Sequence, residues 1–190
     1  MPHKFDPQHM HVLESAERRR DLDPDRVFAL LPVAAGQTIA DIGCGPGFFT
    51  LPLARKVGAG RVYAIDVQEE MLARVRERLA QERVSNVEVV RSEDSDLRIP
   101  KASLDGAFMA CVLHEAEDRG AFLEAVREAL KPGGWAAVIE WQRREMPEGP
   151  PLRERLSPRQ VRLALGKAGL TSVKHHDLSG KHYLVLARRL

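Results

Sequence analysis

Three glycines follow an apolar run near residue 40, in the stretch DIGCGPGFF that covers residues 41 to 49. Gly43, Gly45 and Gly47 lack side chains, so the backbone between them can turn tightly and a ligand can lie directly against it. The helix-like stretch FFTLPLARKVG begins directly behind this turn. The spacing therefore predicts a strand, a glycine turn and a helix, with a ligand held at their junction.

Two carboxylates accompany the glycine turn. Asp66 ends the next apolar run, about 20 residues beyond Gly43, where it can accept hydrogen bonds from both ribose hydroxyls of a nucleoside. Asp41 stands just before the first glycine, where it would repel a pyrophosphate but could meet an ammonium group. Bulky Phe48 stands close behind the glycines, unlike the GxGxxG pattern of dinucleotide sites. Together these features predict a nucleoside with a cationic part.

Apolar runs and amphipathic helical patterns alternate along most of the chain. We expect strands over 38–44, 61–67, 87–92, 105–113 and 135–141, with helices over 48–58 and 68–84 and from 119 to a stop at Pro132. This order predicts a doubly wound α/β sheet that is mostly parallel, with its ligand at the carboxyl ends of the strands. A helix capped by Ser157 then precedes two strands joined by residues 179–181, a hairpin that must add an antiparallel strand.

Composition limits the classes of function. With 190 residues, 44% of them hydrophobic, the chain can build one sizeable core, and we expect one domain over residues 24–190 after a lead segment over 1–23. The net charge of +2 gives no support for a nucleic-acid partner. No apolar run approaches a membrane span or a secretory signal, which predicts a cytoplasmic protein without a membrane partner. Cys44 and Cys111 form no CxxC pair, and no metal site is expected.

The motifs DIGCGPGFFTLPLA, VYAIDV, SLDGAFMACVLHE and EALKPGGWAAVIEW resemble those of the class I S-adenosylmethionine-dependent methyltransferases, near the ubiquinone and menaquinone biosynthesis group. The resemblance covers residues 24–190. It implies a Rossmann-like, seven-stranded sheet whose last strand is antiparallel. It also implies S-adenosylmethionine as the cofactor and S-adenosylhomocysteine as the product.

The resemblance also assigns positions around the cofactor. The turn residues, including Cys44, would surround its amino-acid and ribose parts, Asp66 its ribose hydroxyls and Val67 its adenine. An acidic residue after the third strand would meet the adenine amino edge, and either Glu93 or Asp94 fits. Ala110 and Cys111 would line the methionine part. The cofactor-binding set is therefore Asp41, Gly43, Cys44, Gly45, Gly47, Asp66, Val67, Glu93, Asp94, Ala110 and Cys111.

Fewer residues suggest the chemistry itself. His114 and Glu115 follow the fourth strand, where a general base could face a methyl acceptor, although LHE also reads as the start of a helix. Glu140, Trp141 and Arg144 are candidates for the acceptor pocket. We expect a methyltransferase that acts on a small molecule. A non-catalytic S-adenosylmethionine-binding module and a nucleotide-dependent oxidoreductase remain alternatives, and the sequence specifies neither the acceptor nor the oligomeric state.

Residues 3 to 20 carry more apolar character than a purely solvated tail. One hypothesis is that this segment folds over the pocket as a lid, with Phe5 and Met10 facing the ligands. The alternative is a frayed terminus, or one packed against the outside of the domain.

Overall fold

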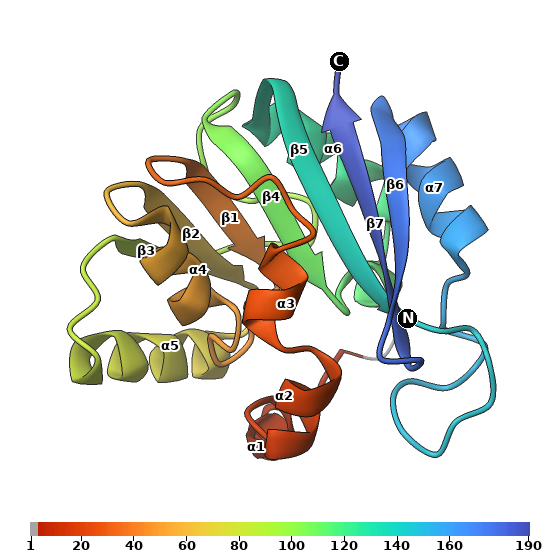
Figure 1. Ribbon diagram of the computed structural model, residues 1–190, viewed down its shortest axis with the longest axis horizontal. Coiled ribbons are helices and arrows are strands. Elements are labelled where there is room, and N and C mark those ends of the chain that lie inside the picture. Colours follow the sequence, from red (N-terminus) through yellow and green to blue (C-terminus); the bar gives the residue numbers. More distant parts are fainter. Residues whose placement is uncertain (1–3) are drawn as a thin grey trace.

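The apolar runs form one sheet of seven strands in the computed structural model, which describes residues 4–190 (Figure 1). The strands are β1 (Thr38–Ile42), β2 (Arg61–Asp66), β3 (Val87–Arg91), β4 (Leu104–Ala110), β5 (Leu130–Trp141), β6 (Leu170–Leu178) and β7 (His182–Arg189). Their order across the sheet is β3-β2-β1-β4-β5-β7-β6. The first five strands pair in parallel, whereas β7 is antiparallel to both of its neighbours. The predicted fold class is confirmed.

Helices cover both faces of the sheet. They are α1 (Met10–Leu13), α2 (Ala16–Asp21), α3 (Pro24–Phe28), α4 (Thr50–Val57), α5 (Glu69–Gln81), α6 (Arg119–Ala129) and α7 (Pro158–Lys167), with 3-10 turns η1 (Pro7–His9) and η2 (Leu113–Glu115). Apolar side chains of α3, α4 and α5 pack on one face, and those of α6 and α7 pack on the other. The predicted cap of α7 is present, because the Ser157 hydroxyl and the Gln160 side chain satisfy each other's backbone N–H groups.

An aromatic cluster fills the core beside the glycine turn. Phe28 and Phe49 each meet Phe108 of β4 edge to face, at ring-centre distances of 5.6 and 4.8 Å. The bulky residues behind the glycines therefore anchor the turn to the core. This packing explains why the start of α4 follows the turn at a fixed position.

Two strand boundaries differ from the sequence expectations by three or more residues. β5 begins at Leu130 and not at Trp135, because Leu130 already pairs with Leu104 before the register shifts at Gly106. Conversely, β4 ends at Ala110 and not at Leu113. Cys111 adopts a φ of +62°, and the chain then turns into η2. Cys111 and Val112 therefore connect the end of β4 to η2, which carries His114.

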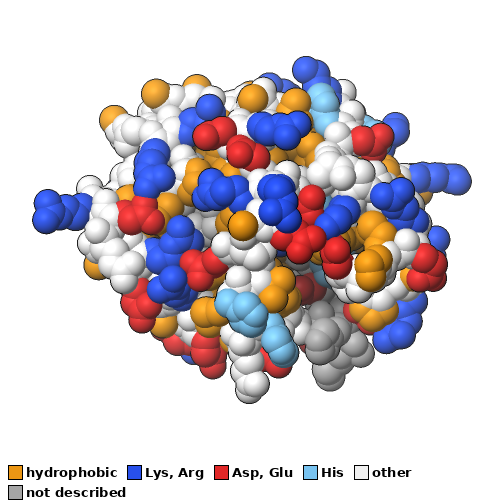
Figure 2. Space-filling model, turned by 60° about the horizontal axis from the view of Figure 1, so that its bottom comes forward, with side chains coloured by type: hydrophobic (Ala, Val, Ile, Leu, Met, Phe, Trp, Pro, Cys, Tyr) orange, Lys and Arg blue, Asp and Glu red, His pale blue; other side chains and the backbone are white. Residues whose placement is uncertain are grey.

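The charged surface is mixed. Over the face seen in Figure 2, basic and acidic side chains are interspersed between small hydrophobic areas. None of the helices in residues 4–190 is both long and apolar enough to cross a membrane.

Candidate functional site

A cavity of about 510 Å³ lies at the carboxyl ends of the parallel strands. Most of the predicted site residues line it, namely Asp41, Gly43, Cys44, Gly45, Asp66, Val67, Asp94, Ala110, Cys111 and His114. Gly47 and Glu93 are outside this lining. Residues between positions 41 and 114 thus converge on one cavity, as the doubly wound topology requires.

The backbone of the glycine turn is held by the end of β2. The amides of Gly43 and Cys44 both donate to the Ile65 carbonyl, at 2.7 and 3.0 Å, and the Gly45 amide donates to Asp66 Oδ2 at 2.9 Å. Gly43 and Gly45 adopt φ values of +67° and +52°, a region that side chains disfavour. A Cβ at Gly43 would also collide with Val112, at 2.3 Å. Both glycines are therefore required by the geometry.

Gly47 has a different role from the other two glycines. A Cβ there would lie 3.1 Å from Leu51 and 3.3 Å from Val75, on the side of α4 and α5. Gly47 therefore allows α4 and α5 to pack closely, and it is not part of the cavity lining.

Asp66 and Asp41 are both buried carboxylates. Asp66 Oδ1 accepts the amide of Gln68 at 3.0 Å, and burial raises the pKa of Asp66 above its ordinary 3.8. Burial also raises the pKa of Asp41 to about 7, against the lowering effect of a 2.6 Å hydrogen bond from the Thr50 hydroxyl. Burial thus disfavours the charged form of both groups, a perturbation that is typical of functional sites.

The structure separates the two acidic candidates after β3. Asp94 lines the cavity, and its carboxylate binds Lys4 Nζ at 2.7 Å. The Glu93 side chain is 70% exposed and pairs with Arg98. Of the two, only Asp94 is placed where a ligand in the cavity could meet it.

The two cysteines are free thiols against the cavity wall. Burial raises the pKa of Cys111 to about 12 and that of Cys44 well above its ordinary value. Both thiols are thus neutral at physiological pH, and their structural role is small apolar packing beside Ala110.

His114 is held by Glu140 through two hydrogen bonds. The His114 amide donates to Glu140 Oε1 at 3.0 Å, and His114 Nδ1 lies 2.7 Å from Glu140 Oε2. The Glu140 side chain is fully buried, and His114 is 4% exposed. Burial alone would lower the pKa of His114, but the charge and hydrogen bond of Glu140 outweigh it and raise that pKa. With Nδ1 bound to a carboxylate, Nε2 is the nitrogen left to exchange a proton.

Glu115 lies on the open side of His114. Its Oε1 is 3.8 Å from His114 Nε2, and its Oε2 accepts the Phe5 amide at 3.4 Å. Burial raises the pKa of Glu115 to about 7. The helix reading of LHE is also correct, since His114 and Glu115 belong to η2. The short helix is what points both side chains at the cavity edge.

Trp141 and Arg144, the other candidates for the acceptor pocket, lie in different places. Trp141 lines the cavity, whereas Arg144 is exposed and donates to the Gly180 carbonyl. Sequence reasoning missed His182, whose ring lies 4.2 Å from that of Trp141 and is buried, with its pKa lowered by burial to about 3. His182 pairs with Trp141 across β5 and β7, so only the antiparallel register could have revealed it.

The N-terminal segment crosses the mouth of the cavity. Phe5, His9 and Leu13 line it, but Met10 does not. The Phe5 carbonyl accepts Gln68 Nε2 at 2.9 Å, and Glu14 pairs with two arginines of α5. The described part of the segment thus lines the cavity and also packs against α5. Residues 1–3 of the expected 1–23 segment lie outside the described residues.

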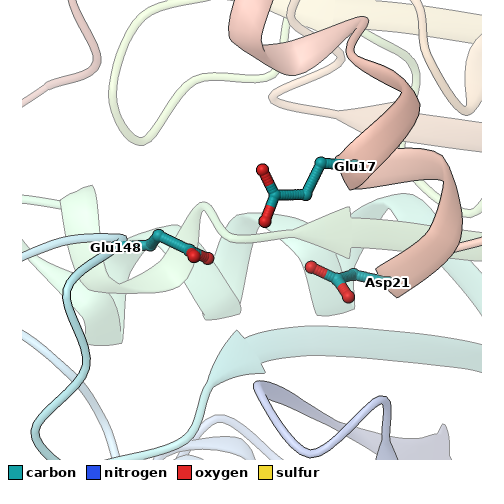
Figure 3. A group of neighbouring side chains, drawn as sticks. All are labelled: Glu17, Asp21 and Glu148. Carbon is teal, nitrogen blue, oxygen red and sulfur yellow. The ribbon is translucent and has the colours of Figure 1, made fainter.

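Three carboxylates from two parts of the chain point toward one another (Figure 3). Glu17 and Asp21 belong to α2, and Glu148 to the loop after β5. Lys181 Nζ binds all three, at 3.1, 2.9 and 2.6 Å, and these bonds raise the pKa of Lys181. A single ammonium group therefore fastens α2 to the hairpin between β6 and β7. Nothing in the sequence pattern indicated this cluster.

Comparison with protein families matches residues 39–134, about half of the chain, to the family described as a methyltransferase domain. The chain is 30% identical over 171 residues to a trans-aconitate 2-methyltransferase of Azoarcus sp., covering 88% of this chain and 62% of that protein. It is 33% identical over 115 residues to the ubiquinone/menaquinone biosynthesis C-methyltransferase UbiE of Marinomonas sp., covering 60% of this chain and 46% of that one. The chain thus spans less than two thirds of these two relatives.

A solved structure matches more completely. The crystal structure described as a SAM dependent methyltransferase from Aquifex aeolicus superposes with a TM-score of 0.94 at 34% identity, covering 98% of this chain and all of that one. The similarity therefore includes the N-terminal segment and the C-terminal hairpin as well as the family-matched core.

We predict that Lys181→Met releases α2. Without the ammonium group, three carboxylates within 4.8 Å of one another repel. Amide exchange over residues 16–21 should become about fivefold faster at low salt, as measured by hydrogen–deuterium exchange. Lys167→Met, at an exposed position of α7, is the control. Equal protection of α2 in both variants would show that the cluster fastens nothing.

Glu115→Gln should change how stability depends on pH. Between pH 4.5 and 7 the unfolded chain loses the Glu115 proton while the folded chain keeps it, so the wild type loses stability as pH rises. The variant should match the wild type near pH 4.5 and exceed it at pH 8 by on the order of 2 kcal/mol in urea unfolding. Glu117→Gln, two residues away and exposed, should show no such divergence. If stability depends on pH in the same way in Glu115→Gln and in the wild type, the raised pKa of Glu115 is contradicted.

Proposed function

Because the chain belongs to the class I S-adenosylmethionine-dependent methyltransferases, we propose that it transfers a methyl group from S-adenosylmethionine to a small-molecule acceptor. The observation that carries this proposal is the joint placement of the glycine turn and Asp66 on one cavity. The cavity volume, about 510 Å³, is within the usual range for small-molecule sites.

The residues present fit the cofactor. Each carboxylate oxygen of Asp66 accepts one hydrogen bond from the protein, Oδ2 from the Gly45 amide and Oδ1 from the Gln68 amide. A carboxylate offers roughly four such sites, so about two remain for ribose hydroxyls. Gly43 and Gly45 present bare backbone to the cavity, and Val67 and Asp94 line the same cavity, where we assign them to adenine stacking and hydrogen bonding. The turn, Ala110 and Cys111 then enclose the amino-acid part.

When bound, S-adenosylmethionine supplies a methyl group already activated by its sulfonium. The protein then has to place the acceptor, exclude water and accept any proton that the acceptor loses. We assign His114 Nε2 as the atom that accepts the proton from the acceptor, because Glu140 already binds Nδ1. Glu115 Oε1 lies 3.8 Å from Nε2 and can share that proton. The products are the methylated acceptor and S-adenosylhomocysteine.

The acceptor side of the cavity favours a small molecule. Trp141, His182 and the loop carrying Glu148 border it, and the N-terminal segment covers its mouth. We therefore assign residues 4–23 as a lid, of which Phe5 but not Met10 faces the ligands. The names of two relatives, a trans-aconitate 2-methyltransferase and a quinone biosynthesis C-methyltransferase, support acceptors of this size. The mixed surface charge argues against a nucleic-acid substrate.

Two experiments separate the alternatives. Calorimetric titration should detect S-adenosylhomocysteine binding and no NADH binding, whereas the reverse would favour a nucleotide-dependent oxidoreductase. Transfer of labelled methyl groups from S-adenosylmethionine to a panel of metabolites should then identify an acceptor. Cofactor binding without transfer to any compound of a broad panel would instead support a non-catalytic binding module.

Asp66→Ala should weaken S-adenosylhomocysteine binding at least about tenfold in calorimetry, because charge-assisted bonds to the ribose hydroxyls are lost. Asp66→Asn, which keeps an acceptor oxygen for the Gly45 amide, should fall between the variant and the wild type. Glu70→Ala, exposed on α5, serves as the control. Unchanged affinity in a folded Asp66→Ala protein would refute the ribose assignment.

Asp94→Asn should weaken adenosine binding about three- to tenfold, the range of one lost hydrogen bond. Glu93→Gln is the matched control, since that neighbouring carboxylate lies outside the cavity lining. Calorimetry with adenosine isolates the nucleoside part. A larger loss in Glu93→Gln than in Asp94→Asn would reverse the assignment.

A further inference from the structure

Arg18 of α2 is a half-buried cation that lines the cavity. Its Nε is buried and has no hydrogen-bond partner within the described residues. The two nearest acidic residues of the same helix, Glu17 and Asp21, give their carboxylates to Lys181. Burying a guanidinium nitrogen without a partner is unfavourable, so a partner for this side chain is expected from outside the chain.

The surroundings of Arg18 place it at one end of the cavity. Its guanidinium carbon lies 5.4 Å from the centre of the Phe48 ring. Arg18 lines the cavity together with Asp41, Cys111 and His182. Lys4, the other cation of the segment in this lining, binds Asp94, the predicted partner of adenine, at 2.7 Å. Lys4 thus belongs to the adenosine part of the predicted site, which leaves Arg18 for the other end of the cofactor.

The chemistry of the cofactor supplies a suitable partner. With the ribose at Asp66, the rest of the molecule extends past the turn toward Ala110 and Cys111, and its amino-acid end carries a carboxylate beside an ammonium group. A guanidinium fork is matched to a carboxylate, which it can bind through two parallel hydrogen bonds. Asp41, on the same side, is matched to the ammonium group.

We propose that Arg18 binds the α-carboxylate of the cofactor's amino-acid part and so couples cofactor binding to closure of α2 over the cavity. This inference rests on the proposed function. Arg18 is well placed for the coupling, because its amide also donates to the hydroxyl of Ser15, the N-terminal cap of α2, at 3.1 Å. A ligand that holds the side chain thus also holds the helix.

The test compares three ligands by calorimetry. S-adenosylhomocysteine has the carboxylate, decarboxylated S-adenosylhomocysteine keeps the amine without it, and 5′-methylthioadenosine lacks the amino-acid part altogether. Arg18→Met should weaken S-adenosylhomocysteine about ten- to hundredfold and change 5′-methylthioadenosine less than about twofold. In the wild type, decarboxylation of the ligand should cost a similar factor, a comparison that needs no variant. Arg18→Lys should be intermediate.

Arg19→Met is the matched control. Arg19 is exposed on the same helix and lies 5.6 Å from the same Phe48 ring, but it does not line the cavity. It should alter the affinity of none of the three ligands. Exchange over residues 16–21 should slow with S-adenosylhomocysteine and change little with 5′-methylthioadenosine.

The outcomes separate the proposals. Equal S-adenosylhomocysteine affinity in Arg18→Met and wild type would overturn the carboxylate assignment and leave Arg18 to the acceptor. An equal loss for all three ligands would overturn it in favour of a role in the fold of α2. Failure of the wild type to bind any of the three would instead refute the proposed function.

Discussion

The site depends on three amide groups of the glycine turn that all donate to the end of β2. Ile65 accepts two of them through its carbonyl, and Asp66 accepts the third through its side chain. These bonds pull the turn over the neighbouring strand and leave its outer surface free of side chains. The carboxylate proposed to bind the ribose is thus also one of the groups that shape the turn. The glycines and Asp66, which are separate signals in the sequence, are thus joined by hydrogen bonds in one turn.

Buried charge accumulates at the same edge of the sheet. Asp41, Glu115, Glu140 and His114 lie in the lining or directly behind it, each desolvated and each balanced by a specific partner. Elsewhere the charged side chains are mostly paired at the surface, where such pairs contribute little to stability. The free-energy cost of burying charged groups is therefore concentrated where proton transfer and ligand binding are proposed.

The sequence predicted local features well and long-range contacts poorly. The alternation of strands and helices, the turn at Gly43 and Asp66 at the end of β2 all follow from patterns within about 30 residues. The hydrogen bonds between Glu140 of β5 and His114 of η2 join positions 26 residues apart. Whether Glu93 or Asp94 faces the cavity depends on the conformation of a loop without a periodic sequence pattern. In the sequence, Arg18 is one of three consecutive arginines. Only the packing of α2, which half-buries Arg18 and leaves Arg19 exposed, distinguishes the two.

The bond between Glu17 and Lys181 joins residues 164 positions apart, close to the two ends of the described chain. β7, which follows Lys181, is the last strand in sequence yet sits between β5 and β6 inside the sheet. During synthesis from the N-terminus, Glu17 and Asp21 emerge long before Lys181, the cation that binds them both. The ion pairs that join α2 to the hairpin can therefore form only after β6 has been made, so this part of the cavity cover is fixed late in folding.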